Sequence, residues 1–113
     1  MPASSPVQNA VESITSMGKF APEAVVPDVE GYLEHLADPI TALSAALKTF
    51  ADHLSGMPVH PSVAEAIKNM IPGLSASAEA AGEVFTLFKA KHGPELDQHY
   101  NPRPQERAWN VNA

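Results

Sequence analysis

The chain has 113 residues, no cysteine, and a formal net charge of −6 from 7 lysines and arginines against 13 aspartates and glutamates. The length suits one small domain, and the acidic balance excludes the basic stripe with which proteins bind nucleic acid or anionic membranes. Without cysteine, disulfides and thiolate metal sites are excluded as well. Because 44% of the residues are hydrophobic but only 6% are aromatic, we expect a thin core that a third helix or a second subunit completes.

Residues 1–27 are predicted to form a short N-terminal helix and a stiff connector. Ser5 and Pro6 suit a helix start, and the connector contains Pro22 and Pro27, which discourage a helix from continuing. Along the helix runs a single apolar stripe: Val7, Val11, Ile14 and Met17. We expect this helix either to cover part of the following helices or to form only with a partner.

Residues 28–93 are predicted to form a long antiparallel helical hairpin, so the fold class is all-α. In both arms apolar positions alternate at spacings of three and four residues, which is typical of helices packed along their length, as in coiled coils. The stripe of the first arm is Val29, Leu33, Leu36, Ile40, Leu43, Leu47, Phe50 and Leu54. That of the second is Ile67, Ile71, Leu74, Ala78, Ala81, Phe85, Phe88 and His92. We expect Leu43, Leu47, Leu74 and Phe85 to be buried where the arms meet.

Local signals within the hairpin predict two kinks and a turn. The apolar rhythm passes through Pro39 and Pro72, so we expect each proline to kink its arm, with Asp38 capping the segment after the first kink. Across the hairpin, the two kinks are expected about one helical turn apart. In the turn, Gly56 is expected to be a left-handed cap, and Ser62 to cap the second arm.

Residues 94–113 are predicted to form an extended C-terminal tail, because Pro94, Pro102 and Pro104 prevent a continuous helix. This stretch contains the only tryptophan and the only arginines of the chain, and aromatic residues beside arginine are typical interface anchors. The alternative is that the tryptophan folds back onto its own hairpin.

A second part of the predicted interaction site lies near the end of the second arm. There, Val84, Phe85, Leu87 and Phe88 surround most of the helix, and one neighbouring helix cannot cover them all. The complete set of predicted protein-interaction residues is Phe85, Phe88, Arg103, Arg107, Trp109 and Val111.

Catalytic, metal and cofactor sites are not predicted. The five histidines include no pair at the i, i+4 spacing of metal ligands, and the Glu-x-x-His motif of di-iron helical bundles is missing. No nucleophile elbow and no phosphate-binding glycine loop occurs, so we do not expect an enzyme. The ridge Glu30, Glu34 and Asp38 is interpreted as a solvated acidic face.

The leading hypothesis is a non-enzymatic assembly or adaptor protein that forms a homo-oligomer or packs on a protein partner. A small acidic regulator that occludes an enzyme or a basic protein is one alternative. Since no secretory signal and no stretch of ~20 apolar residues occurs, we expect a cytoplasmic protein without a membrane span, with signal-independent export left open.

The remaining alternative is that the protein is exported or assists export. The length and hairpin plan resemble the small secreted helical-hairpin proteins of the WXG100 kind, which implies an exported substrate or a secretion partner. The chain has Ser55-Gly56-Met57 where that family has Trp-x-Gly in the turn. Its residues 100–104, Tyr-Asn-Pro-Arg-Pro, lack the acidic residue of the family's Tyr-x-x-x-Asp/Glu export signal.

Overall fold

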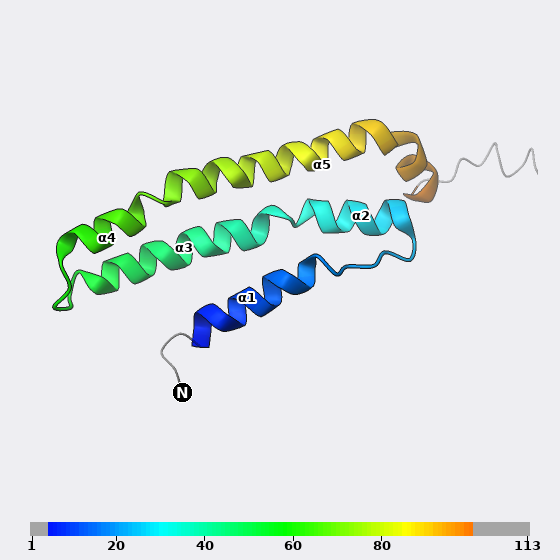
Figure 1. Cartoon of the computed structure of the whole chain (residues 1–113). Coiled ribbons are helices and arrows are strands. Elements are labelled where there is room, and N and C mark those ends of the chain that lie inside the picture. Colours follow the sequence, from blue (N-terminus) through cyan, green and yellow to red (C-terminus); the bar gives the residue numbers. More distant parts are fainter. Residues whose placement is uncertain (1–4, 101–113) are drawn as a thin grey trace, which may run out of the picture.

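The computed structural model describes residues 5–100, which form five helices and no strand (Figure 1). The all-α class predicted from the sequence is therefore confirmed for this part of the chain. The helices are α1 (Ser5–Met17), α2 (Val25–Glu34), α3 (Ala37–Leu54), α4 (Pro61–Lys68) and α5 (Ile71–Tyr100).

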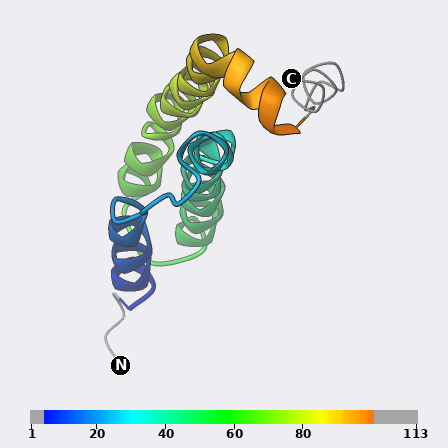
Figure 2. The ribbon, with the colours of Figure 1, turned by 90° about the vertical axis from the view of Figure 1, so that its right-hand side faces the viewer.

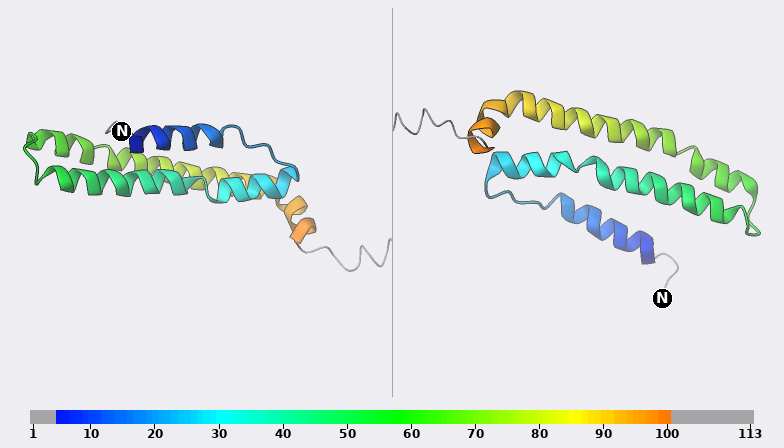
Figure 3. Two further views of the ribbon diagram at one scale, coloured as in Figure 1. Left: turned by 90° about the horizontal axis from the view of Figure 1, so that it is seen from below. Right: turned by 180° about the vertical axis from the view of Figure 1, so that it is seen from behind.

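The helices are arranged in two antiparallel rows, with α1 at one side. One row consists of α2 followed by α3, and the other consists of α4 followed by α5 (Figure 1). α3 packs against both α4 and α5, while α2 packs against α5. Viewed along the rows, α1 lies outside this pair of rows (Figure 2). α1 runs antiparallel to α3 (Figure 3).

Each row is broken shortly before a proline. The first break, at residues 35–36, precedes Pro39 in the first turn of α3, and the second, at residues 69–70, precedes Pro72 at the second position of α5. A proline fits the first turn of a helix because the backbone N–H that it lacks has no intrahelical partner there. The chain therefore bends near both prolines, but each bend lies upstream of its proline.

Asp38 does not cap the segment that follows the first break. α3 begins at Ala37, its N-cap is Leu36, and no side chain caps it. Asp38 Oδ2 instead lies 3.0 Å from Nδ1 of His35, at an exposed position. The predicted cap is wrong because Pro39 occupies the third helical position and not the first.

The two breaks also lie further apart across the rows than the one helical turn expected from the sequence. Lys68, at the end of α4, reaches Asp52 near the end of α3, with 3.5 Å between Nζ and Oδ1. Ile71, just after the second break, shares a groove with Lys48. The second break therefore lies beside the C-terminal half of α3, whereas the first lies before the N-terminus of α3.

The reversal between the rows uses neither of the predicted caps. None of the six glycines has a positive φ, so Gly56 is not a left-handed cap; its N–H bonds to the carbonyl of His53 at 3.1 Å. α4 is capped by His60, whose Nδ1 accepts from the backbone N–H of Ser62 at 3.1 Å. Pro61, with its fixed φ, takes the first helical position and so makes His60, and not Ser62, the N-cap.

The core of the described chain is thin. Its buried apolar residues are Ala51, Leu54, Ala64, Ala81 and Leu96, and no large side chain is fully buried. Ala51, Leu54 and Ala64 form one cluster close to the reversal, with the partly buried Ile67 packed against it. Small residues at the contact allow α3 and α4 to approach closely, but they contribute little apolar area.

The two apolar stripes differ in how completely they are covered. All eight stripe positions of the second row are buried or half-buried, including Leu74 and Phe85. In the first row Leu47 is half-buried, but Leu43 and Phe50 are exposed at 42% and 49%. The prediction that Leu43 is buried is wrong, because this residue lies on the side of α3 that faces α1 and not α5.

α5 continues beyond the predicted end of the second arm. The backbone leaves helical geometry at His92 (φ −118°, ψ 18°), but helix resumes through Pro94 as far as Tyr100. His92 Nδ1 lies 2.9 Å from Oε1 of Glu95, and Leu96 is buried. Residues 94–100 are thus helical and not extended, because Pro94 stands in the first turn of the new segment. Residues 101–113 lie outside the described part.

Candidate interaction surfaces

The structure places the predicted interaction residues of α5 less openly than expected. Phe85 and Phe88 are half-buried, with the Phe88 ring 4.8 Å from that of His92 and Lys89 Nζ 5.1 Å from the centre of the Phe85 ring. The accessible apolar surface belongs to their neighbours Val84 and Leu87, exposed at 44% and 58%. The other predicted residues, Arg103, Arg107, Trp109 and Val111, lie outside the described residues.

A larger apolar surface lies between α1 and the row of α2 and α3. Along α1, Val7, Val11 and Ile14 are exposed at 63%, 52% and 53%. Where α1 is nearest the row, a groove with a volume of about 210 Å³ opens between the helices. Its lining is entirely apolar: Ile14, Met17, Leu36, Pro39, Ile40 and Leu43. We call this the α1–α3 groove.

The C-terminal end of α1 is held against α2 by Tyr32. The Tyr32 hydroxyl donates to the carbonyl oxygen of Met17 at 2.9 Å, and the Tyr32 ring stacks on Phe20 with centroids 5.0 Å apart. Asp28 Oδ2 fixes the connector by accepting from the backbone N–H groups of Glu23 and Ala24 at 3.0 and 3.1 Å. No residue of α1 is buried, so α1 covers little of the neighbouring row beyond its C-terminal end.

The sequence contained the signals for this surface. The apolar stripe on α1 predicts a helix that either covers part of the following helices or forms only with a partner. On α3, Leu43 and Phe50 are seven residues apart and lie on the same face of the helix. Both are exposed, so the regular spacing of the first-arm stripe does not mean that one neighbouring helix covers all of it.

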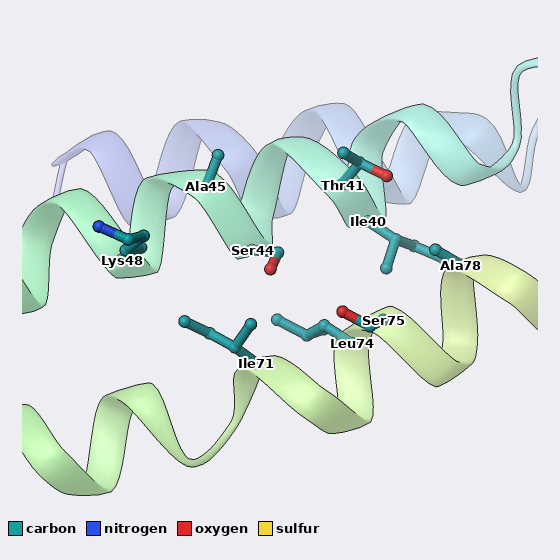
Figure 4. A pocket seen from close by; sticks show the side chains of 9 residues that line it. All are labelled: Ile40, Thr41, Ser44, Ala45, Lys48, Ile71, Leu74, Ser75 and Ala78. Atoms are coloured by element: carbon teal, nitrogen blue, oxygen red, sulfur yellow. The ribbon is translucent and has the colours of Figure 1, made fainter.

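A second groove lies between α3 and α5 (Figure 4). Its volume is about 330 Å³, and it exists where small side chains of the two helices face each other. The lining residues are Ile40, Thr41, Ser44, Ala45, Lys48, Ile71, Leu74, Ser75 and Ala78. The only titratable side chain among them is Lys48, whose Nζ bonds to Asp52 at 3.1 Å. This lining provides van der Waals contacts but no acid–base pair.

Charged side chains tie α3 to α4 at the surface. Asp52 accepts from Lys48 at 3.1 Å and lies 3.5 Å from Lys68 Nζ. The hydrogen bond from Lys48, followed by the positive charges of Lys48 and Lys68, lowers the pKa of the Asp52 carboxyl below its ordinary value. Because the group is exposed, water screens this pairing.

The predicted acidic ridge is not a continuous face. Glu34 ends α2 and Asp38 lies in α3, so the break at residues 35–36 separates them, and Asp38 is paired with His35. In the described range, no group of three or more histidine and acidic residues is placed to hold a metal ion. His60, one of the five histidines considered, is the cap of α4.

No protein-family model matches the chain, and neither a curated protein nor a solved structure shows significant similarity to it. Among the described helices, none combines the length and the apolar character that crossing a membrane requires. The interaction surfaces therefore provide the evidence from which a function is proposed.

Proposed function

We propose that the chain is a non-enzymatic helical assembly or adaptor protein. In this proposal, residues 28–93 act as a helical hairpin that self-associates or packs on a protein partner, and the C-terminal residues 101–113 contribute to binding. Arg103, Arg107, Trp109 and Val111 remain the proposed anchors of that C-terminal segment.

One observation carries the proposal: three helices each present two or more large apolar side chains to water. Isolated exposed apolar residues are ordinary, but residues that follow one another along a helix face indicate a contact surface. The exposed residues on these faces are Val7, Val11 and Ile14 of α1, Leu43 and Phe50 of α3, and Val84 and Leu87 of α5.

The thin core supports the same proposal. The largest buried cluster contains two alanines and one leucine, Ala51, Ala64 and Leu54. Apolar burial contributes roughly 25 cal/mol per Å², so alanines stabilise a fold much less than leucines do. Covering the exposed faces by another chain would add apolar contacts that residues 5–100 do not make among themselves.

Light scattering on the full chain over a wide concentration range tests the proposal. We expect a mass above the 12.0 kDa of one chain at micromolar concentration, or a stoichiometric complex with a co-purified protein. A single 12.0 kDa species at all concentrations, with fully cooperative unfolding and no bound protein, would contradict it.

A further inference from the structure

Near the α1–α3 groove, the stripe of α1 and the face of α3 that carries Leu43 and Phe50 are left exposed by the described residues. Ile14 of α1 and Leu43 of α3 both line the groove, so the two helices are near each other at this point. α1 runs antiparallel to α3 (Figure 3); away from the groove, the stripe of α1 continues to Val11 and Val7, and the α3 face with Leu43 continues to Phe50. All four of these residues are nevertheless exposed. An apolar helix is needed to cover both stripes at once.

The charges around these stripes indicate what kind of helix fits. α1 contains one charged residue, Glu12, and the stretch of α3 from Pro39 to Ala51 contains one, Lys48, which is already bonded to Asp52. Charge depletion is the compositional mark of the centre of protein interfaces. The exposed residues of α5 also have charges close by in the sequence, with Glu83 next to Val84 and Lys89 two residues after Leu87.

The low charge matters most for contact between two copies of the same chain. Each copy carries a net charge of −6, so most pairs of surfaces repel when two copies meet. A two-fold symmetric contact places the same patch on both sides and must therefore be complementary to itself. The apolar, charge-poor surface of α1 and α3 meets this condition, because it brings no row of carboxylates together.

The available area predicts a weak contact. A helix of 13 residues is ~20 Å long, and two adjacent helices are together ~20 Å wide, so the face measures about 400 Å² in projection. Stable complexes bury about 800 Å² of accessible surface on each partner, and transient ones bury less. The contact is therefore expected to be smaller than that of a stable complex.

We infer that a second copy of the chain occupies the α1–α3 groove. The result is a symmetric dimer in which α1 of each copy packs its Val7, Val11 and Ile14 stripe against α1 and α3 of the other. This inference rests on the proposed function and goes beyond it by naming the surface, the partner and the symmetry.

Substitutions on opposite sides of α1 test the inference by sedimentation of the full chain. Val11→Glu places a carboxylate in the contact, and we expect dimerisation to weaken by at least tenfold. Asn9→Glu adds the same charge on the other side of the helix, since two residues correspond to ~200° of rotation, and should change association less than twofold. Circular dichroism on both variants verifies that helix content is retained.

Cross-linking provides a measurement that does not depend on a destabilising charge. The chain has no cysteine, so a single cysteine introduced at Val7, Val11 or Ile14 can form a disulfide only with the same position of another copy. At least one of them should form a disulfide-linked dimer on mild oxidation, while the control Asn9→Cys should remain mostly monomeric. In a double variant with cysteines at Val7 and Phe50, efficient disulfide formation within single chains would show that α1 closes on its own α3, which overturns the inference.

The same experiments separate this inference from the proposed function. A dimer that tolerates Val11→Glu but dissociates with Val84→Glu would overturn the α1–α3 contact and leave self-association intact. A chain that remains monomeric at all concentrations would overturn the dimer, and the proposed function would then depend on a different protein as partner.

Discussion

The Tyr32 hydroxyl donates a 2.9 Å hydrogen bond to the carbonyl oxygen of Met17, fifteen residues earlier in the chain. This bond joins the last residue of α1 to α2, and it is reinforced by the stacking of Tyr32 on Phe20. It fixes where α1 leaves the two rows of helices, and so determines the position of the α1–α3 groove.

Tyr32→Phe removes the hydrogen bond and retains the ring. We expect the free energy of unfolding to fall by about 0.5–1.5 kcal/mol, the usual contribution of one hydrogen bond. Amide hydrogen exchange should show faster opening of α1 and unchanged protection in α5. Tyr32→Ala, which also removes the ring stacking, should have a larger effect; equal effects would show that the hydroxyl contributes nothing.

Burial predicts different outcomes for two leucines of the same helix. Leu54→Ala removes a leucine from the main cluster and should destabilise the chain by ~2–5 kcal/mol. Leu43→Ala, at an exposed position, should reduce stability much less in dilute monomer. Urea unfolding at low protein concentration measures both; a larger loss for Leu43 would show that the α1 side of α3 is covered within one chain.

How far the sequence predicts this fold is clearest in the second row. From Ile67 to His92 every predicted stripe position is buried or half-buried, because the spacing of apolar residues shows which side of a helix has a neighbour. The spacing does not show how many neighbours there are. Leu43 and Phe50 follow the same rhythm as Leu47, yet both are exposed, and Leu43 lines the groove beside α1.

Helix ends and the exposed side of a helix are harder to predict from the sequence than the helices themselves. Glycine and proline mark an interruption, but they do not determine whether helix resumes, as it does after His92. In the apolar cluster of α5, Val84 and Leu87 are exposed, whereas Phe85 and Phe88 are half-buried. Which side of such a helix is covered depends on packing between residues distant in sequence.

The cap of α4 gives a test at a single residue. His60 Nδ1 accepts from the Ser62 N–H, so His60→Ala removes an N-cap and should lower stability by about 0.5–2 kcal/mol. His60→Asn supplies one of the best capping side chains and should preserve or raise stability. Thermal unfolding measures the stability of both variants. If His60→Ala and His60→Asn lose the same stability, the histidine stabilises the turn in another way.

Asp52 predicts a dependence on pH. Its pKa is lowered in the folded chain, first by the hydrogen bond from Lys48, so its contribution is present above the ordinary value near 3.8 and is lost as the pH falls through the folded value. Asp52→Asn should therefore be less stable than the original chain at neutral pH, and the two should converge below about pH 4. Thermal midpoints measured from pH 7 to pH 2 give the comparison. A difference that stays constant with pH would show that the charge of Asp52 is not involved.

Removal of the C-terminal segment should separate binding from folding. Buried residues occur as far as Leu96 and described helix as far as Tyr100, so a chain that ends at Asn101 keeps every contact reported for the two rows. We expect this truncation to retain helix content and thermal stability, and to weaken assembly or partner binding through loss of Arg103, Arg107, Trp109 and Val111.

Circular dichroism and sedimentation of the truncated chain measure the two effects separately, with Trp109→Ala in the full chain as the matched control. If the truncated chain unfolds at a much lower temperature while Trp109→Ala does the same, the tryptophan belongs to the core of its own chain. The proposed role of these residues in binding would then be wrong, and assembly would have to depend on the helix faces alone.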